Sequence, residues 1–486
     1  MWIGSGSRKS PPPIRRDVVM EQSQALLSPA FFPRLRVLFL AGVACLSLPT
    51  ARAGLWTTAY YTGYEQSSLP ASNIDFTALT HIIHFSVVPN SNGSLNSSDN
   101  SITPANSADV VSRGHAAGVK VLICVGGAST ETDFQAATSA ATLPVFINSL
   151  TNFLAARGYD GVDIDWEPLP SSDAQQYTNL VIGLRAALNQ FSQPKLLTAA
   201  VGAYPPYGDP PTAEYQMYAS LQNQFDQINI MTYDLSGPYE GWVTWFNSPI
   251  YDGGYRFPST GGLVPSINGS VTNFLGNGVA PGKLGFGIPF YGYVWTDGEG
   301  PYSWSITQPR QSWTNAPTIT AYDYTGIMAH YYQPDLYHWD TNAQAAYLSI
   351  TNAVEADNVF LSYDDQRACQ AKVSYARNER LGGVMIWELA QDHQAGVPDP
   401  LLESVKQAMA TPGPLVVQPS GNNLNLGFTA IPLGSYVVQW SSNLAAGSWN
   451  TLDTTNIAGL GGGVQVTDTG AVTNQPVRFY RVKTPP

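Results

Sequence analysis

Residues 160–167 read Asp-Gly-Val-Asp-Ile-Asp-Trp-Glu and combine the alternation of a β-strand with a dense set of carboxyl groups. Because successive side chains of a strand point to opposite faces, Asp163, Asp165 and Glu167 share one face and the apolar residues between them share the other. In an antiparallel sheet this pattern would be an ordinary solvent-facing surface. In a parallel barrel, helices cover the outer face of each strand, so the three carboxyl groups would point into the barrel.

Three acids held this close together are unfavourable unless some of them are protonated or hydrogen-bonded. Such perturbed carboxyl groups are typical of functional sites. Glu167 lies at the C-terminal end of the predicted strand, which is the end where barrel enzymes build their active sites. A carboxyl group kept neutral by its neighbours is suited to be a general acid, and Glu167 is the candidate.

The surrounding sequence predicts a barrel, because eight short β-rich runs alternate with helical patterns. The runs are Trp56–Gly63, His81–Val87, Val119–Gly126, Gly161–Trp166, Leu196–Val201, Gln227–Tyr233, Lys283–Pro289 and Gly383–Trp387. Residues 145–157 show helical spacing of apolar side chains, with Gly158 as a C-cap. We therefore predict an α/β fold, a (β/α)8 TIM barrel over residues 54–411. A connection of about 70 residues after the seventh strand is too long for a loop, so we predict an inserted α+β module at about 293–360.

The pattern changes after about residue 411. Thr411-Pro-Gly-Pro414 is typical of a linker, which we place at 412–418. The short alternating runs beyond it contain no helical stripe, so we expect residues 419–486 to form a separate, small all-β sandwich-like domain. Trp440 and Trp449 in this domain are either core residues or contacts to a polysaccharide.

The first 53 residues have the features of an N-terminal extension and a secretory signal peptide. Two arginines at 34–36 precede an apolar run at 37–48, and Ala51-Arg-Ala53 supplies small residues before the expected cleavage site. The apolar run is shorter than the ~20 residues that a membrane-spanning helix needs. We therefore expect no membrane span, and a secreted protein, extracellular or periplasmic, that begins at Gly54.

The composition excludes several other classes of partner. The 486 residues carry 23 basic and 35 acidic side chains, a net charge of −12, which disfavours nucleic acid as a partner. The six histidines show no spacing typical of metal ligands, so we expect no metal and no other cofactor. Cys124 and Cys369 remain after cleavage, and two buried free thiols are the commoner outcome for such positions. We expect a monomer.

Residues 160–167 resemble the DxxDxDxE signature of glycoside hydrolase family 18, which contains the chitinases and their relatives. Further stretches resemble the family's strands in the right order, from residue 54 to about 408. They are Ala59-Tyr60-Tyr61, His84-Phe85, Cys124-Val-Gly126-Gly127, Met231-Thr-Tyr233-Asp234, Gly287-Ile-Pro-Phe-Tyr-Gly292, Phe360-Leu-Ser-Tyr-Asp-Asp365 and Gly383-Val-Met-Ile-Trp387-Glu388. The predicted insertion also resembles the α+β insertion of one chitinase subgroup.

The resemblance implies a chitinase that hydrolyses β-1,4-linked N-acetylglucosamine polymers with retention and without an enzyme nucleophile. Glu167 would be the general acid and base while the substrate's own acetamide attacks the anomeric carbon. Asp165 would hydrogen-bond the acetamide nitrogen, and Asp163 would share a proton with Asp165. Tyr233 and Asp234 would position the acetamide. The expected partners are chitin or chitooligosaccharides.

The resemblance also implies binding and supporting residues around these acids. The substrate-binding residues would be Trp387 as the floor beneath the sugar, Met231, Tyr61, Phe85 and Trp166. The supporting residues would be Tyr60, Cys124, Gly126, Gly127 and Asp160. Core packing is the alternative role for Trp387 and Met231. Cys124 stands where the family usually has Ser, and a thiol is a weaker hydrogen-bond donor to the innermost Asp than a hydroxyl; a small core filler is its alternative role.

Two other functions remain open at this stage. One is a non-catalytic chitin-binding or sugar-binding, lectin-like barrel, although such relatives typically lose the acid or its neighbouring Asp. The other is an endo-β-N-acetylglucosaminidase that acts on N-glycans or peptidoglycan. Several tryptophans after the sixth strand and in the insertion line a sugar-binding cleft or belong to the core, and the sequence does not separate these roles. They are Trp242, Trp245, Trp295, Trp304, Trp313 and Trp339.

Overall fold

The computed structural model describes most of the chain after the expected signal peptide. The described residues are 54–203, 212–300, 306–354, 357–409, 415–430, 435–443, 445, 447–456, 462–474 and 478–483. The predicted extension and signal peptide at 1–53, the linker stretch Thr411-Pro-Gly-Pro414 and Trp304 lie outside these residues.

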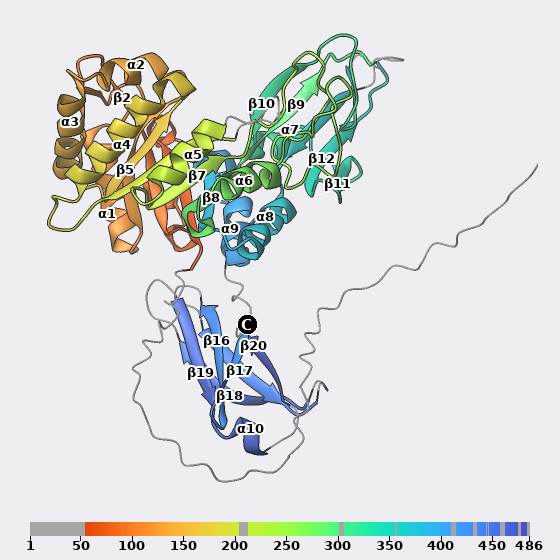
Figure 1. The fold of residues 1–486 in the computed structure, drawn as a ribbon. Coiled ribbons are helices and arrows are strands. Elements are labelled where there is room, and N and C mark those ends of the chain that lie inside the picture. The colour runs from red at the N-terminus through yellow and green to blue at the C-terminus, as the bar shows by residue number, and fades with distance from the viewer. Residues whose placement is uncertain are drawn as a thin grey trace, which may run out of the picture. The chain divides into compact units, whose positions relative to one another are not determined.

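Eight parallel strands close into a barrel, as the sequence predicts (Figure 1). In spatial order they are β1 (Trp56–Thr62), β2 (His81–Pro89), β4 (Lys120–Gly127), β5 (Gly161–Trp166), β6 (Leu196–Gly202), β7 (Gln227–Met231), β8 (Leu284–Pro289) and β14 (Gly383–Trp387). The barrel is closed because β1 pairs in parallel with both β2 and β14. A two-residue strand, β3 (Leu95–Asn96), adds an antiparallel hairpin to the end of β2.

Helices follow most barrel strands and cover their outer faces (Figure 1). They are α1 (Pro104–Ala116), α2 (Glu131–Ala137), α3 (Leu143–Arg157), α4 (Ala174–Leu188), α5 (Thr212–Leu221), α6 (Ile267–Gly276), α8 (Gln366–Asn378) and α9 (Pro400–Met409). Short 3₁₀ turns complete the connections at η1 (Gly63–Glu65), η2 (Ala71–Asn73), η3 (Phe76–Ala78), η4 (Ser171–Asp173), η5 (Pro281–Lys283) and η7 (Leu389–Asp392). Gly158 ends α3 with a φ of 78°, which is the left-handed C-cap that the sequence predicts.

The strands separate two cores. The outer core lies between strands and helices, and β5 contributes Val162, Ile164 and Trp166 to it. The inner core fills the barrel and consists of Tyr60, Ile83, Phe85, Leu122, Cys124, Ala200, Tyr233, Tyr291 and Met385. The alternate residues of β5, Asp163 and Asp165, are buried at 0% and 2% exposure on the inner side.

An α+β insertion lies between β8 and β14, where the sequence predicts it. Its five-stranded antiparallel sheet runs β10-β9-β13-β12-β11 and is accompanied by α7 (Figure 1). The elements are β9 (Tyr291–Thr296), β10 (Thr318–Asp323), α7 (Tyr324–His330), β11 (Tyr337–Asp340), β12 (Ala345–Ile350) and β13 (Val359–Tyr363). The module thus begins directly after β8 and slightly outside the expected range of 293–360.

The insertion and the segment after β7 share a core of their own, which uses several of the tryptophans. Trp245 and Trp295 are fully buried in it, and Trp242 is 8% exposed. Trp313 packs at its edge, and Arg367 stacks 4.1 Å above the ring of Trp339. The aromatic residues of this region therefore serve mainly as core.

The C-terminal residues form two three-stranded antiparallel sheets around one small core. One sheet contains β15 (Val416–Ser420), β16 (Asn423–Ala430) and β19 (Gly462–Asp468), and the other β17 (Ser435–Ser441), β18 (Asn450–Asn456) and β20 (Phe479–Lys483), with α10 (Ala471–Asn474) beside them. The shared core makes this a sandwich. β15 begins at Val416, within the stretch 412–418 that the sequence predicts as a linker. Arg478 and Arg481 stack on the rings of Trp440 and Trp449.

Within the described part of the chain, every helix is too short or too polar to cross a bilayer.

Candidate active site

The acidic strand β5 turns its carboxyl groups into the barrel. Asp163 and Asp165 are buried, while Glu167 follows the last residue of the strand and is half-buried at its C-terminal end. In the parallel register Asp163 lies beside Cys124 of β4, and Asp165 lies beside Gly126. The series of acids thus runs from the centre of the barrel to its rim.

The innermost acid, Asp163, is held by three side-chain donors. Tyr60 donates its hydroxyl hydrogen to Oδ2 at 2.7 Å, and Thr198 of β6 donates to Oδ1 at 2.5 Å. The Cys124 thiol supplies a further hydrogen bond. Burial raises the pKa of Asp163 to about 6, while these three hydrogen bonds oppose the shift because they favour the carboxylate.

Asp165 and Glu167 share a hydrogen bond and together retain a proton. Burial raises the pKa of Asp165 well above its usual range, and the negative charges of Glu167 and Asp163 add to this shift. Burial also raises the pKa of Glu167, which the hydrogen bond from Asp165 opposes. Asp165 Oδ1 is buried without a partner among the described residues. The pair therefore holds a proton at a pH where ordinary carboxyl groups are ionised, which is what a general acid requires.

The end of β7 supplies the second half of the site. Tyr233 is buried in the inner core, with its hydroxyl 3.8 Å from Met385 Sδ. Burial raises the pKa of Tyr233, and the negative charges of Asp165, Glu167, Asp234 and Asp163 add to this shift. The next residue, Asp234, is exposed and has a φ of 56°. These residues therefore lie close enough to the acids of β5 for strong electrostatic interaction.

Two tyrosines of the insertion hold the Asp234 carboxylate. Tyr291 and Tyr293, both on β9, each donate a hydroxyl hydrogen to Asp234 Oδ1 at 2.5 Å. Neither they nor Thr198 is among the site residues expected from the sequence. The signal for the tyrosines was their spacing of two residues on a strand that directly follows the seventh barrel strand, which places both on one face.

Aromatic rings form the wall beside these groups. Trp387 at the end of β14 is half-buried and contacts Tyr60 and Phe85, with ring centroids 5.1 and 4.9 Å apart. Met231 is also half-buried and packs on the inner core. Trp387 and Met231 therefore present part of their surface to the acids' end of the barrel.

Two glycines on β4 permit this close packing. Gly127 has a φ of 118°, and a Cβ atom there would lie 2.7 Å from the ring of Phe85. Gly126 has a φ of 111°, and a Cβ atom would lie 2.0 Å from the backbone oxygen of Asp165. Both positions thus need glycine for conformation and for space.

Three residues expected at the site lie elsewhere. Tyr61 is buried in the outer core and donates to the Leu69 carbonyl oxygen at 2.7 Å. Trp166 also faces outward, stacked on Phe134 with centroids 4.6 Å apart. Asp160 precedes β5 and accepts hydrogen bonds from His115 and from the Val121 N–H, at the opposite end of the strand from Glu167. Strand alternation turns Tyr61 and Trp166 away from the acids, and Asp160 lies at the opposite end of β5. These three residues therefore do not belong to the candidate site.

Both cysteines of the described chain are free and buried. Cys124 lies in the inner core and Cys369 in the outer core. Within the same described ranges, His, Cys, Asp and Glu side chains form no group of three or more that could hold a metal ion.

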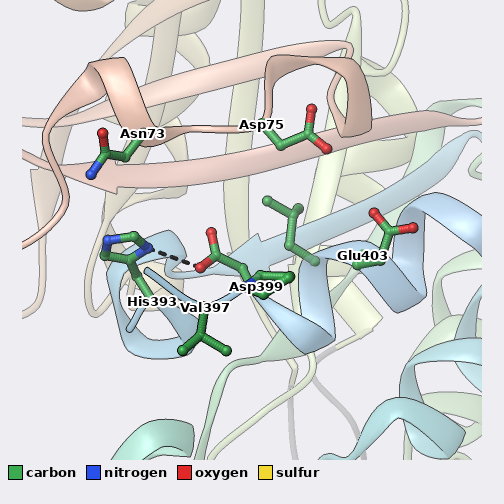
Figure 2. Close-up of a pocket in the computed structure, with 8 residues that line it drawn as sticks. Asn73, Asp75, His393, Val397, Asp399 and Glu403 are labelled. Carbon is green, nitrogen blue, oxygen red and sulfur yellow. Dashed lines mark hydrogen bonds and ion pairs between the residues drawn. The ribbon is translucent and has the colours of Figure 1, made fainter. Parts of the chain in front are cut away.

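A separate pocket of about 210 Å³ lies between the connection after β1 and the connection that follows η7. Its lining residues are Asn73, Asp75, His393, Val397, Pro398, Asp399, Leu402 and Glu403. Figure 2 shows the hydrogen bond of 2.9 Å between His393 Nδ1 and Asp399 Oδ1 on one side, with Asn73 and Asp75 on the other. None of the acids or aromatic residues of the candidate site lines this pocket.

Several known proteins are similar to this chain in sequence. The family model described as "Glycosyl hydrolases family 18" matches residues 57–392. Chitinase A1 of Niallia circulans is 29% identical over 392 residues, which are 74% of this chain and 53% of that protein, so the chain spans about half the length of this relative.

Solved structures show the same fold. The group IV chitinase of Ostrinia furnacalis, in complex with allosamidin, has a TM-score of 0.62 at 21% identity and covers 73% of this chain and 99% of its own. A GH18 chitinase mutant from Cycas revoluta, in complex with (GlcNAc)4, has a TM-score of 0.60 at 23% identity, with the same two coverages. At these identities the likeness concerns the fold.

Proposed function

The chain belongs to glycosyl hydrolase family 18, and from this premise we propose that it is a secreted chitinase that cleaves β-1,4-linked N-acetylglucosamine polymers with retention of configuration. The observation that carries the proposal is the hydrogen-bonded pair of buried Asp165 and half-buried Glu167, whose pKa values are both raised and which interacts with Tyr233 and Asp234 at the same end of the barrel. The relatives named above are chitinases, one of them in complex with (GlcNAc)4.

Glu167 acts first as a general acid. It donates its proton to the glycosidic oxygen, and the bond from that oxygen to the anomeric carbon breaks as the leaving sugar departs with the proton. The carbonyl oxygen of the substrate's own acetamide forms a bond to the same carbon, giving a cyclic oxazolinium ion; this substrate-assisted route differs from the scheme with two enzyme carboxylates. Glu167, now ionised, takes a proton from water, whose oxygen opens the ring with net retention.

The other two acids of β5 support this cycle. Asp165 hydrogen-bonds the acetamide nitrogen and balances the positive charge that develops on the ring. Asp163, anchored by Tyr60 and Thr198, keeps negative charge behind Asp165 and so helps the Asp165–Glu167 pair to hold its shared proton. When Glu167 carries this proton, Asp165 is ionised and faces the developing positive charge. Asp165 therefore stabilises the reacting sugar directly, and Asp163 acts on the sugar only through its effect on Asp165.

The opposite side of the site binds the acetamide and the sugar ring. Tyr233 and Asp234 orient the acetamide for attack, because a near-attack geometry is required for this intramolecular step. Trp387 forms the floor beneath the sugar, with Phe85 supporting it edge-on. Met231 lines the apolar side of the pocket.

Product analysis on chitin oligosaccharides of defined length tests the proposed function. We expect the hexamer of N-acetylglucosamine to yield shorter oligomers whose new reducing ends are initially β-anomers. Peptidoglycan and an N-glycan core serve as parallel substrates. Cleavage of either, with the hexamer left intact, would instead identify an endo-β-N-acetylglucosaminidase. Binding of the hexamer without cleavage of any substrate would identify a lectin-like barrel.

Cys124→Ser tests how Asp163 is stabilised. A hydroxyl is a stronger donor than a thiol, so the substitution favours the Asp163 carboxylate and lowers its pKa from the present value of about 6. We expect activity to persist and the acidic limb of the kcat/KM profile to move to lower pH, because Asp163 then ionises at lower pH. A pH profile identical to that of the wild type would show that Cys124 only fills space.

A further inference from the structure

A fully buried ion pair lies outside the candidate site. Lys372 of α8 contacts Oδ2 of Asp364, the residue after β13, and their side chains are 0% and 3% exposed. Burial lowers the pKa of Lys372, and the Asp364 carboxylate opposes that shift. Removing two charges from water is expensive, and apolar replacements of such pairs are often as stable or more so. Stability alone therefore does not explain this pair.

The lysine also contacts the segment that follows β7. Lys372 Nζ donates to Ser248 Oγ at 2.6 Å, and Ser248 Oγ donates to the carbonyl oxygen of Thr232 at 2.6 Å. Thr232 directly precedes Tyr233 in the sequence. A chain of buried polar contacts thus leads from the ion pair to the backbone of the acetamide-binding residues.

The neighbouring residue, Asn247, also holds this backbone. Its Oδ1 accepts the N–H of Asp234 at 2.9 Å, and its own N–H donates to Ser362 Oγ of β13 at 2.9 Å. Residues 247–248 therefore link the end of β7 to β13 and α8. The last strand of the insertion and the helix after it jointly support the Tyr233–Asp234 segment.

The segment needs such support because of its backbone conformation. Asp234 has a φ of 56°, in the left-handed region that residues with a Cβ atom adopt at a cost and keep only where neighbours enforce it. The hydrogen bonds that Tyr291 and Tyr293 donate hold its side chain. Asn247, which accepts the Asp234 N–H, and Ser248, which donates to the Thr232 carbonyl oxygen, hold the backbone around it.

We infer that Lys372, paired with Asp364, is a positioning residue that acts through Ser248 to hold Tyr233 and Asp234 where they orient the substrate's acetamide. The catalytic consequence rests on the proposed function, whereas the positioning itself is a property of the fold. Both charges are buried, so their effect on the reaction is exerted through Ser248 and not by contact with the substrate.

Ser248→Ala tests the link directly, since it leaves the ion pair in place. Ser107→Ala is a control of the same kind, because Ser107 is also buried and also accepts from a cationic side chain, the Arg157 guanidinium, at 3.0 Å. Ser107 lies on α1 outside the barrel, where it accepts from the Tyr159 hydroxyl and donates to the Thr103 carbonyl oxygen, both at 2.9 Å. The double variant Lys372→Met with Asp364→Asn removes both charges without leaving either one unpaired.

Steady-state kinetics on a fluorogenic chitobioside and binding of a chitobiose-derived thiazoline, which mimics the cyclised acetamide, provide the readouts. A misplacement of about 1 Å at a reacting group lowers rates by up to ~10²-fold. We expect Ser248→Ala and the double variant to lower kcat by roughly 10–100-fold and to weaken thiazoline binding in parallel, with KM within about threefold. Ser107→Ala should keep the wild-type kcat at a similar loss of Tm.

Equal kcat values for Ser248→Ala and Ser107→Ala would overturn the inference. Failure of the proposed function has a different signature, namely a wild-type protein that neither cleaves the chitobioside nor binds the thiazoline. Crystal structures then decide the positioning role. An Asp234 carboxylate that loses its contacts with Tyr291 and Tyr293 in Ser248→Ala supports the inference, and an unmoved Asp234 contradicts it.

Discussion

Glu167→Gln lowers kcat on chitin oligosaccharides by at least ~10²–10⁴-fold, the range expected when a general acid is removed. The amide has nearly the same shape as the carboxyl group and still makes hydrogen bonds, but it has no proton to give to the glycosidic oxygen and none to take from water. Because the lost interaction belongs to the transition state, KM and the affinity for the intact oligosaccharide should change little. Steady-state kinetics and calorimetric titration with the tetramer measure both quantities.

A control variant separates this loss from a general effect of replacing a glutamate with glutamine. Glu214 lies on α5 and is 6% exposed, so Glu214→Gln makes the same chemical change on an outer helix. We expect this control to keep wild-type kcat. Turnover of Glu167→Gln near the wild-type rate would refute the assignment of Glu167 as the proton donor, whatever the activity of the control.

Asp165→Asn is expected to lower kcat by ~10²–10³-fold, the usual effect of losing one preorganised electrostatic partner of a transition state. Asparagine can still donate a hydrogen bond to Glu167, but it carries no negative charge to balance the oxazolinium ion. The substitution also ends the sharing of a proton between Asp165 and Glu167. The two apparent pKa values of the coupled pair should be replaced by the single titration of Glu167 in the pH profile of kcat/KM.

The first acid of the same signature provides the control for this variant. Asp160 lies at the other end of β5, where its carboxylate pairs with His115 and Lys120 on the surface. Asp160→Asn should therefore keep the wild-type kcat and pH profile. A pH profile of Asp165→Asn that keeps both wild-type limbs would contradict the shared proton, even if its kcat fell.

The strand pattern of residues 160–167 predicts that the acids share one face, and the eight strand runs that alternate with helical patterns predict the barrel that turns this face inward. The period of two is a local property of the backbone, so it separates Asp163 and Asp165 from Ile164 and Trp166 in any strand. The same rule excludes Trp166 and Tyr61 from the interior, and their expected role as sugar contacts followed from the family likeness alone. At these two positions the alternation of the strand predicts the direction of the side chain correctly, and the resemblance to the family does not.

The local sequence pattern does not predict the polar contacts that complete the site. Thr198 donates to Asp163 across 35 positions of sequence, and Lys372 reaches Ser248 across 124. A threonine in a β-rich run and a lysine in an amphipathic helix carry no local sign of these partners. The burial of Trp245 and Trp295 likewise depends on how the insertion closes over the segment after β7.

The sequence by itself determined which side chains share a face, which runs become strands and helices, and which residue carries the acid at the strand end. Periodicity and capping act over a few residues, so they can be read without knowing the fold. Only the tertiary structure decided which donors hold Asp163, which tyrosines hold Asp234 and where the buried lysine acts. These depend on the register of distant strands and on the packing of the insertion, because the pKa of a buried acid is set by everything that surrounds it in space.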